Sequence, residues 1–379
     1  MFTKTIKSKI TPVGLDLGET AVRGAQLRRT GGEFVITRMG QVERPKATGT
    51  SRPPFELDVA RLFSASSFKG KSVVAALNPP EVEFHVLELP QAALQGGADA
   101  QQIIHWEIGR LTPGTAGSTQ QVETRHWLLP ARPGNTTTAT AIGVCAPVPA
   151  VTRLLHLCAE CHLHCTCVDT GATALHRLGS LLRSWDPHEI WGVLDLGSRQ
   201  SRLLLCLADA PILIRHTGGG GQAWTERIAE ALHLSPASAE IQKRSHGIAA
   251  LASRESRVDV QPATHDEVAV LLLGALRSEL NDMAAEIKRS YEYVLNSYPG
   301  RRAGDLVLVG GGAALPNLPE FLSGILGIPV RRFSSYLDEP HCRIRLETKA
   351  SHACEPFASA IGLAISSELL ISHVRKASP

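Results

Sequence analysis

Two short segments of the chain place an aspartate shortly before a glycine, each at the end of an apolar run. The first is Asp16-Leu-Gly18 and the second is Asp195-Leu-Gly197, and an arginine follows each aspartate at the same interval. A second apolar run comes after each glycine. This order is typical of a β-hairpin whose turn begins Asp-x-Gly. The internal repetition predicts two related lobes, each containing one such hairpin.

Tight turns of this kind suit the binding of a phosphate group. Their backbone N–H groups can form a nest around phosphate oxygens, and glycine allows the backbone to approach closely. A carboxylate repels phosphate but can hold Mg²⁺, usually through water, because Mg²⁺ dehydrates reluctantly. Two such turns that face each other would hold a phosphate chain from both sides, with Asp16 and Asp195 around one Mg²⁺.

Two glycine-rich segments follow in the second half of the chain. Gly220-Gly221 precedes a predicted helix and forms a turn that a ligand can approach closely. Gly310-Gly-Gly312 comes between a buried strand and a predicted helix, where exposed backbone can lie against a base and ribose. Each feature is common on its own. The order of the two hairpins and the two glycine segments along the chain is what indicates a single nucleotide site.

The patterns between these segments predict a mixed α/β fold that must position them. The longest one, 265–297, has apolar residues at three-to-four spacing and predicts one long amphipathic helix. Further predicted strands are 71–77, 82–89, 140–145, 165–168, 211–216 and 305–309, and further predicted helices are 101–110, 151–161 and 318–326. Stretches rich in Pro, Gly and Ser at 44–54, 112–119 and 130–137 predict surface loops.

The composition is that of an ordinary globular protein. Of the 379 residues, 43% are hydrophobic and 20% are charged, and the formal net charge is only +3. This charge does not indicate a nucleic-acid partner. No run approaches the roughly 18 uninterrupted apolar residues of a transmembrane helix, and the basic N-terminus lacks the apolar core of a signal peptide. We therefore expect a cytoplasmic protein. We also expect two lobes, because the length exceeds what one core usually supports.

Four cysteines and two histidines cluster near the middle of the chain: Cys158, Cys161, His162, His164, Cys165 and Cys167. The cysteine spacing, C-x2-C-x3-C-x-C, is not a zinc-ribbon pattern. The first half of the cluster reads as a helix and the second half as a strand, whose alternate side chains point to opposite faces. Cysteine is also often buried as a small hydrophobic residue. We therefore expect these cysteines to be structural.

Taken in order, these segments resemble the superfamily of actin, hexokinase and heat-shock ATPases, and within it the FtsA and PilM families. Besides the two hairpins, the matching segments are 102–113, 220–225, 239–243, 286–290, 306–320, 326–330 and 357–364. The resemblance spans 13–364. It implies an α/β, two-lobed actin-like ATPase fold with an FtsA-like inserted subdomain.

The resemblance also implies how the chain divides. The first lobe would contain 11–78 and 165–188, with the inserted subdomain at 79–164 between these two parts. The second lobe would be 189–345. A C-terminal helix at 346–375 would return to the first lobe.

By the same resemblance the chain binds ATP and Mg²⁺, with Asp16 and Asp195 at the metal. The residues that it assigns to the nucleotide are Asp16, Gly18, Arg23, Asp195, Gly197, Gly220, Gly221, Glu240, Lys243, Gly310, Gly311 and Gly312. From the residues alone, Glu240 and Lys243 read instead as an exposed helix pair.

The sequence departs from the family pattern at two positions. Glu19 stands where a small polar residue usually faces phosphate, and its charge would repel the nucleotide unless it points away or shares the metal. Gly171 stands where relatives commonly have Glu, so a side chain that positions the attacking water is missing. Asp169 lies nearby but ends a buried strand and can equally be structural. We expect little or no ATP hydrolysis.

The resemblance implies a cytoplasmic scaffold of the type IV pilus that binds ATP and the N-terminal tail of a PilN-like inner-membrane protein. Such a protein would reach the inner face of the inner membrane through this partner, and it can form a homo-oligomer. One alternative is a small-molecule or sugar kinase, or an ATPase, of the same superfamily, which would need an Asp general base near the attacking hydroxyl. The other is the cytoplasmic component of a type II secretion system.

Overall fold

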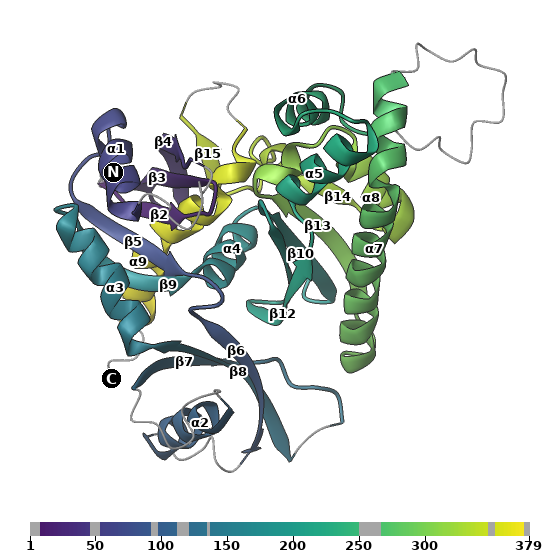
Figure 1. Cartoon of the computed structure of the whole chain (residues 1–379). Coiled ribbons are helices and arrows are strands. Elements are labelled where there is room, and N and C mark those ends of the chain that lie inside the picture. Colours follow the sequence, from purple (N-terminus) through teal and green to yellow (C-terminus); the bar gives the residue numbers. More distant parts are fainter. Residues whose placement is uncertain are drawn as a thin grey trace, which may run out of the picture.

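The computed structural model describes residues 8–45, 54–91, 98–111, 121–134, 137–249, 267–347 and 353–374. Three sheets, with seven, five and three strands, organise this part of the chain. Figure 1 shows the two larger sheets with helix α4 (Gly171–Ser180) between them and the small sheet below. No helix in the described ranges is long and apolar enough to span a membrane.

The seven-stranded sheet contains the first hairpin. Its strand order is β15-β4-β3-β2-β5-β9, and β1 pairs with β3. The strands are β1 (Lys9–Ile10), β2 (Val13–Leu17), β3 (Ala21–Thr30), β4 (Glu33–Glu43), β5 (Ser72–Leu77), β9 (His164–Thr170) and β15 (Ile344–Leu346). The alternation along β2 sends Val13 and Leu15 into one core, which they share with Val59 and Leu62 of α1 (Phe55–Ala65) and with residues of α3 (Val148–Glu160).

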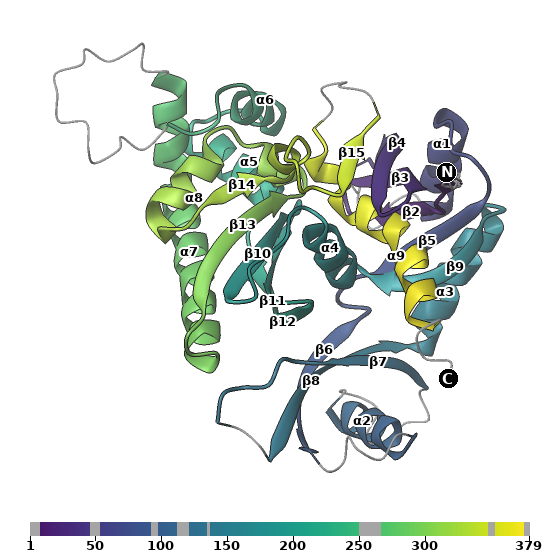
Figure 2. The ribbon, with the colours of Figure 1, turned by 180° about the vertical axis from the view of Figure 1, so that it is seen from behind.

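The opposite face of this sheet is covered by α9 (Ala358–Val374), as Figure 2 shows from behind. Helix α9 and strand β2 pack so closely at Gly14 that a Cβ there would lie 1.9 Å from the Ala360 carbonyl oxygen. A Cβ on Gly362 would likewise lie 2.1 Å from the carbonyl oxygen of Ala174 in α4. Gly14 thus lets α9 lie directly on the strand that leads to Asp16, and Gly362 lets α9 lie against α4.

The five-stranded sheet contains the second hairpin, in the order β12-β11-β10-β13-β14. Its strands are β10 (Glu189–Leu196), β11 (Gln200–Leu207), β12 (Ala210–Gly218), β13 (Arg302–Val309) and β14 (Val330–Arg332), and the helices beside it are α5 (Gly221–Ala231), α6 (Pro236–His246), α7 (Glu267–Ser297) and α8 (Leu318–Leu326). The predicted apolar stripe of α7 is buried, as at Leu272, Leu280 and Ile287. Short 3-10 turns cover Gly311–Ala314, Phe333–Tyr336 and Glu355–Phe357.

The small sheet has the order β6-β8-β7, with β6 (Glu83–Pro90), β7 (Val122–Leu128) and β8 (Thr138–Pro147), and α2 (Ala98–Leu111) covers one face. It also touches the five-stranded sheet, where the Trp127 indole donates to the Pro211 carbonyl at 2.9 Å. The next helix, α3, packs on β5 and β9 of the seven-stranded sheet and also on β8 of the small one.

The strands and helices predicted from periodicity are all present, with ends that differ by a few residues. The loop predicted at 112–119 lies outside the described residues, as do 46–53 of the loop at 44–54 and 135–136 of the loop at 130–137. The described parts of these loops contain no helix or strand.

Candidate nucleotide-binding cleft

The two hairpins have matching geometry. In the register of β2 and β3, Asp16 lies opposite Arg23, and in that of β10 and β11, Asp195 lies opposite Arg202. Residues opposite each other in an antiparallel pair share one face of the sheet. The equal Asp-to-Arg interval in the sequence therefore corresponds to a carboxylate and a guanidinium side by side in each hairpin.

The turn glycines have no room for a side chain. A Cβ on Gly18 would lie 2.7 Å from the Ala21 carbonyl oxygen, and a Cβ on Gly197 would lie 2.6 Å from that of Gln200. These distances are too short for a Cβ, so both turns require glycine at these positions.

The two aspartates are close enough to influence each other. Burial raises the pKa of Asp16 to about 6, against the opposing charge of Arg23, and the charge of Asp195 raises it further. Burial also raises the pKa of Asp195, while Arg202 and Arg23 act to lower it. Two half-buried carboxylates that repel each other are the kind of donor pair that a divalent cation stabilises. The residues fit the Mg²⁺ predicted from the sequence.

The raised pKa of Asp16 predicts that its ionised carboxylate, which would serve metal binding, lowers the stability of the nucleotide-free fold. A raised folded-state pKa means that the ionised form opposes folding, and this cost is fully present above the folded pKa of about 6. Asp16→Asn should therefore raise the melting temperature of the nucleotide-free protein at pH 8. The gain should vanish below about pH 3.8, where the carboxyl is protonated in both states. Melting curves across this pH range test the prediction, and an equal gain at every pH would contradict it.

The glycine pair before α5 holds the helix against the second turn. The Gly221 N–H donates to the Gly197 carbonyl at 2.9 Å, and the Gln222 N–H donates to that of Ser198 at 2.8 Å. A Cβ on Gly220 would lie 2.5 Å from the Ser198 oxygen. The carbonyl groups of the turn are thus engaged by the helix.

The triple glycine lies beside the same turn. Gly310 has φ +84°, and a Cβ there would lie 2.6 Å from Asp195 Oδ1. A Cβ on Gly312 would lie 2.9 Å from Leu196 Cβ, whereas nothing lies within 4 Å of one on Gly311. A Cβ on Gly221 would lie 3.9 Å from Gly312 Cα. The structure therefore brings both glycine segments and the second hairpin together.

Lys243 corrects the expectation of an exposed helix pair. It does form an ion pair with Glu240 at 2.6 Å, but its side chain is buried. Its ammonium group also donates to the Gly221 carbonyl at 2.6 Å. Burial lowers the pKa of Lys243, although Glu240 acts to raise it. The pair thus belongs to the packing of α5 against α6, next to the glycines.

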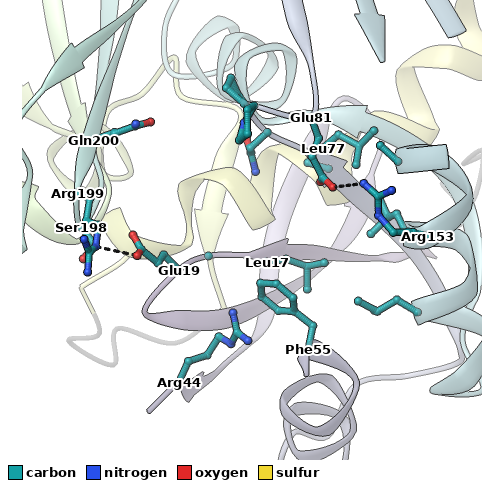
Figure 3. Close-up of a pocket in the computed structure, with 18 of the residues that line it drawn as sticks. Leu17, Glu19, Arg44, Phe55, Leu77, Glu81, Arg153, Ser198, Arg199 and Gln200 are labelled. Carbon is teal, nitrogen blue, oxygen red and sulfur yellow. Dashed lines mark hydrogen bonds and ion pairs between the residues drawn. The ribbon is translucent and has the colours of Figure 1, made fainter. Parts of the chain in front are cut away.

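A cavity of about 1050 Å³ opens on the first-lobe side of the hairpins (Figure 3). It is lined by both turns, by the end of β5, and by α1 and α3. Gly18 and Asp195 lie in its wall, together with Arg44, Phe55, Asn78, Glu81, Thr152, Arg153, His156, Arg199 and Arg202. Gly221, Lys243 and Gly312 do not line it. The cavity is therefore lined by residues of the two hairpin turns but not by these residues of the glycine segments.

Glu19 meets a partner that sequence reasoning missed. Its carboxylate pairs with Arg199 at 2.8 Å, which joins the first turn to the second in the wall of the cavity (Figure 3). Arg199 offsets the negative charge that we expected to repel phosphate. The two residues are far apart in the sequence, and each comes shortly after the glycine of one Asp-x-Gly hairpin. The repetition of this hairpin is therefore the one sequence feature that could have indicated their contact.

The position of Gly171 is filled by other side chains. A Cβ at this residue would lie 2.3 Å from Arg202 Nη1 and 2.5 Å from Asn78 Oδ1. Arg202 Nη2 donates to Asn78 Oδ1 at 2.9 Å. An arginine and an amide thus occupy the space beside the second hairpin, and residue 171 contributes no carboxylate there.

Asp169 is fully engaged within the fold. Its carboxylate accepts hydrogen bonds from the Thr170 N–H at 2.7 Å and the Ser366 hydroxyl at 2.8 Å. It also pairs with Arg177 and accepts from Thr173. These contacts tie β9 to α4 and α9. The structural reading of Asp169 is therefore correct, and no acceptor position remains for a substrate hydroxyl.

The cysteine cluster is consistent with a structural role. Cys158 is buried in the core beneath α3, and Cys161 and Cys165 pack against the same core. A hydrogen bond from Cys158 lowers the pKa of Cys165 to about 7, in spite of burial. Within the described ranges, the ligand atoms of these cysteines do not gather as a group of three or more.

Comparison with known proteins supports the fold. The model of the family described as cell division protein FtsA matches residues 192–362. A structure of the PilM–PilN type IV pilus biogenesis complex matches with a TM-score of 0.71 and 20% identity, over 94% of this chain and 98% of that chain. Ethanolamine utilization protein EutJ from Carboxydothermus hydrogenoformans matches with a TM-score of 0.51 and 13% identity, over 94% and 89%. No curated protein sequence matches the chain. The predicted α/β, two-lobed actin-like ATPase fold is confirmed.

Proposed function

We propose that this chain is an ATP-binding scaffold of the type IV pilus assembly platform and binds the N-terminal tail of a PilN-like inner-membrane protein. One observation supports this above the others. The cavity extends from the phosphate turns past Asn78 to Glu81, where the chain enters the small sheet, and to Arg153 of α3. A single cavity can thus adjoin a nucleotide at one end and a peptide at the other. In this proposal the protein works in the cytoplasm and reaches the membrane through its partner.

ATP would lie with its phosphates between the two turns. Asp16 and Asp195 would hold Mg²⁺, which supplies screening of the phosphate charge. Arg23 and Arg202, each opposite one of these aspartates, add positive charge next to the phosphates. The base and ribose would lie against Gly310–Gly312, Gly220–Gly221 and the buried Lys243–Glu240 pair. This assignment rests on the convergence of these residues around the second hairpin.

The partner would bind as an extended peptide on the first-lobe side. Extended peptides gain affinity in such grooves from main-chain hydrogen bonds and from side-chain pockets. The walls offer apolar surface at Phe55 and Leu77 and charge at the Glu81–Arg153 ion pair, whose separation is 2.8 Å. An amphipathic segment with both apolar and charged side chains matches this lining.

The scaffold should hydrolyse ATP slowly. Hydrolysis needs an oriented water as well as bound phosphate. Gly171 has no side chain for this task, and the carboxylate of Asp169 is held by Arg177 and Ser366. We expect fewer than about one turnover per second, below the usual enzyme range. Steady-state phosphate release with Mg-ATP, alone and with common sugars, tests this, and faster turnover would replace the scaffold with an ATPase or a kinase.

A further inference from the structure

The small sheet carries a group of potential metal ligands that the nucleotide cleft does not use. Glu83 and His85 lie near the start of β6, and Cys145 lies near the end of β8. These are the two strands through which the chain enters and leaves the small sheet. The group therefore lies at the end of the small sheet that connects to the rest of the molecule.

Strand geometry explains why the three side chains meet. Glu83 and His85 are two residues apart, so both point to the same face of β6. In the register of β6 with β8, Glu83 lies opposite Cys145, and His85 lies opposite Gly143. The Ile108 side chain of α2 fills the space beside Gly143, since a Cβ on this glycine would lie 2.6 Å from Ile108 Cδ1. One ligand atom from each of the three residues lies within 4.8 Å of the others.

His85 has an unsatisfied nitrogen at this point. Its Nε2 atom is buried and makes no hydrogen bond, although it lies 3.2 Å from Glu83 Oε2. The approach is close, but its direction is not that of a hydrogen bond. A buried polar atom without a partner carries a free-energy cost. A ligand that accepts the nitrogen lone pair would remove this cost.

The donor types select the class of ion. A thiolate, an imidazole and a carboxylate are the ligands that Zn²⁺ takes in proteins, whereas Mg²⁺ and Ca²⁺ prefer oxygen. We propose that Glu83, His85 and Cys145 form a zinc site, with water as the fourth ligand. This site is separate from the phosphate turns and does not depend on the proposed function.

The position of the site gives the ion a structural role. Cys145 belongs to the apolar cluster that joins β6 and β8 to α2, together with Leu87 and Ile104. An ion bound there links the start of β6 to the end of β8. Glu83 remains partly exposed and provides the route by which the ion enters. Metal binding should therefore stabilise the small sheet against local unfolding.

Cobalt absorption provides the test, because a thiolate bound to Co²⁺ gives an intense near-ultraviolet charge-transfer band. The full chain, purified without a histidine tag and stripped with a chelator, should bind one Co²⁺ with this band, and Zn²⁺ should displace it. Cys145→Ser should abolish the band. His85→Gln should weaken cobalt binding at least tenfold, and this more exposed position guards against loss of folding in the cysteine variant.

Matched controls separate this site from other cysteines and histidines. Cys161→Ser lies in the other cysteine cluster, and His126→Gln lies on β7 opposite the same Gly143. Both should keep the band and the affinity. The proposal is overturned if the chain binds no cobalt at micromolar concentration, if Cys145→Ser keeps the band, or if Cys161→Ser removes it.

Discussion

Asp195→Ala should remove most of the Mg²⁺-dependent binding of ATP. The substitution deletes one of the two carboxylates proposed to hold the ion, and the charge of Asp195 is close enough to raise the pKa of Asp16. At an ATP concentration a hundred times the dissociation constant, the wild-type fold should gain about 2.7 kcal/mol in its free energy of unfolding. The variant should gain little, and Asp16→Ala should behave in the same way.

Thermal denaturation with and without Mg-ATP measures this effect. Asp209→Ala, an exposed aspartate in the turn between β11 and β12, is a suitable control and should keep the full shift. Without nucleotide, Asp195→Ala should be at least as stable as the wild type, because burial raises the pKa of Asp195 and makes its charge costly. A full ATP shift in Asp195→Ala would rule out the metal assignment.

The local parts of the site could be predicted from the sequence because short-range rules specify them. A tight turn needs glycine at Gly18 and Gly197, whatever the rest of the chain does. The equal interval from each aspartate to its arginine defines a cross-strand pair once the turn length is set. The long helix α7 follows from its own periodicity. These features depend on neighbours in the chain.

The contacts between distant segments could not be predicted in the same way. The burial of Lys243 requires α6 to lie against the start of α5, and an i, i+3 pair looks the same on an exposed helix. The Glu19–Arg199 pair and the Arg202–Asn78 hydrogen bond exist only because the two lobes face each other. The order of motifs indicates that the hairpins converge but not which side chains meet between them.

The cavity adds a site that no motif indicated. Its wall combines the two turns with α1 and α3, and neither helix carries a recognisable binding sequence. On α3, the exposed residues Thr152 and His156 line the cavity, and the buried Leu154 lines it as well while it packs in the core beneath. The helix therefore uses one face for packing and a neighbouring face for the cavity. Its contribution depends on how it is placed on the seven-stranded sheet.

This placement allows the partner site to be blocked without disturbing the fold. Thr152→Trp and His156→Trp add bulk at exposed positions one turn apart on α3, and both point toward the cavity. A peptide in the groove would collide with the new rings, so we expect each variant to weaken binding of a PilN-like tail peptide at least tenfold. Leu155→Trp is the matched control, since Leu155 is exposed on the same helix but does not line the cavity.

Titration of a fluorescent peptide, followed by anisotropy, distinguishes these variants, with the Mg-ATP melting shift recorded for each. The two cavity variants should lose peptide binding and keep the ATP shift, because neither position lies at a phosphate turn. Removal of 79–164 should have the same selective effect if the remaining chain folds. Undiminished peptide binding in both tryptophan variants would place the partner elsewhere, while loss of binding in Leu155→Trp as well would point to an effect on α3 rather than on the groove.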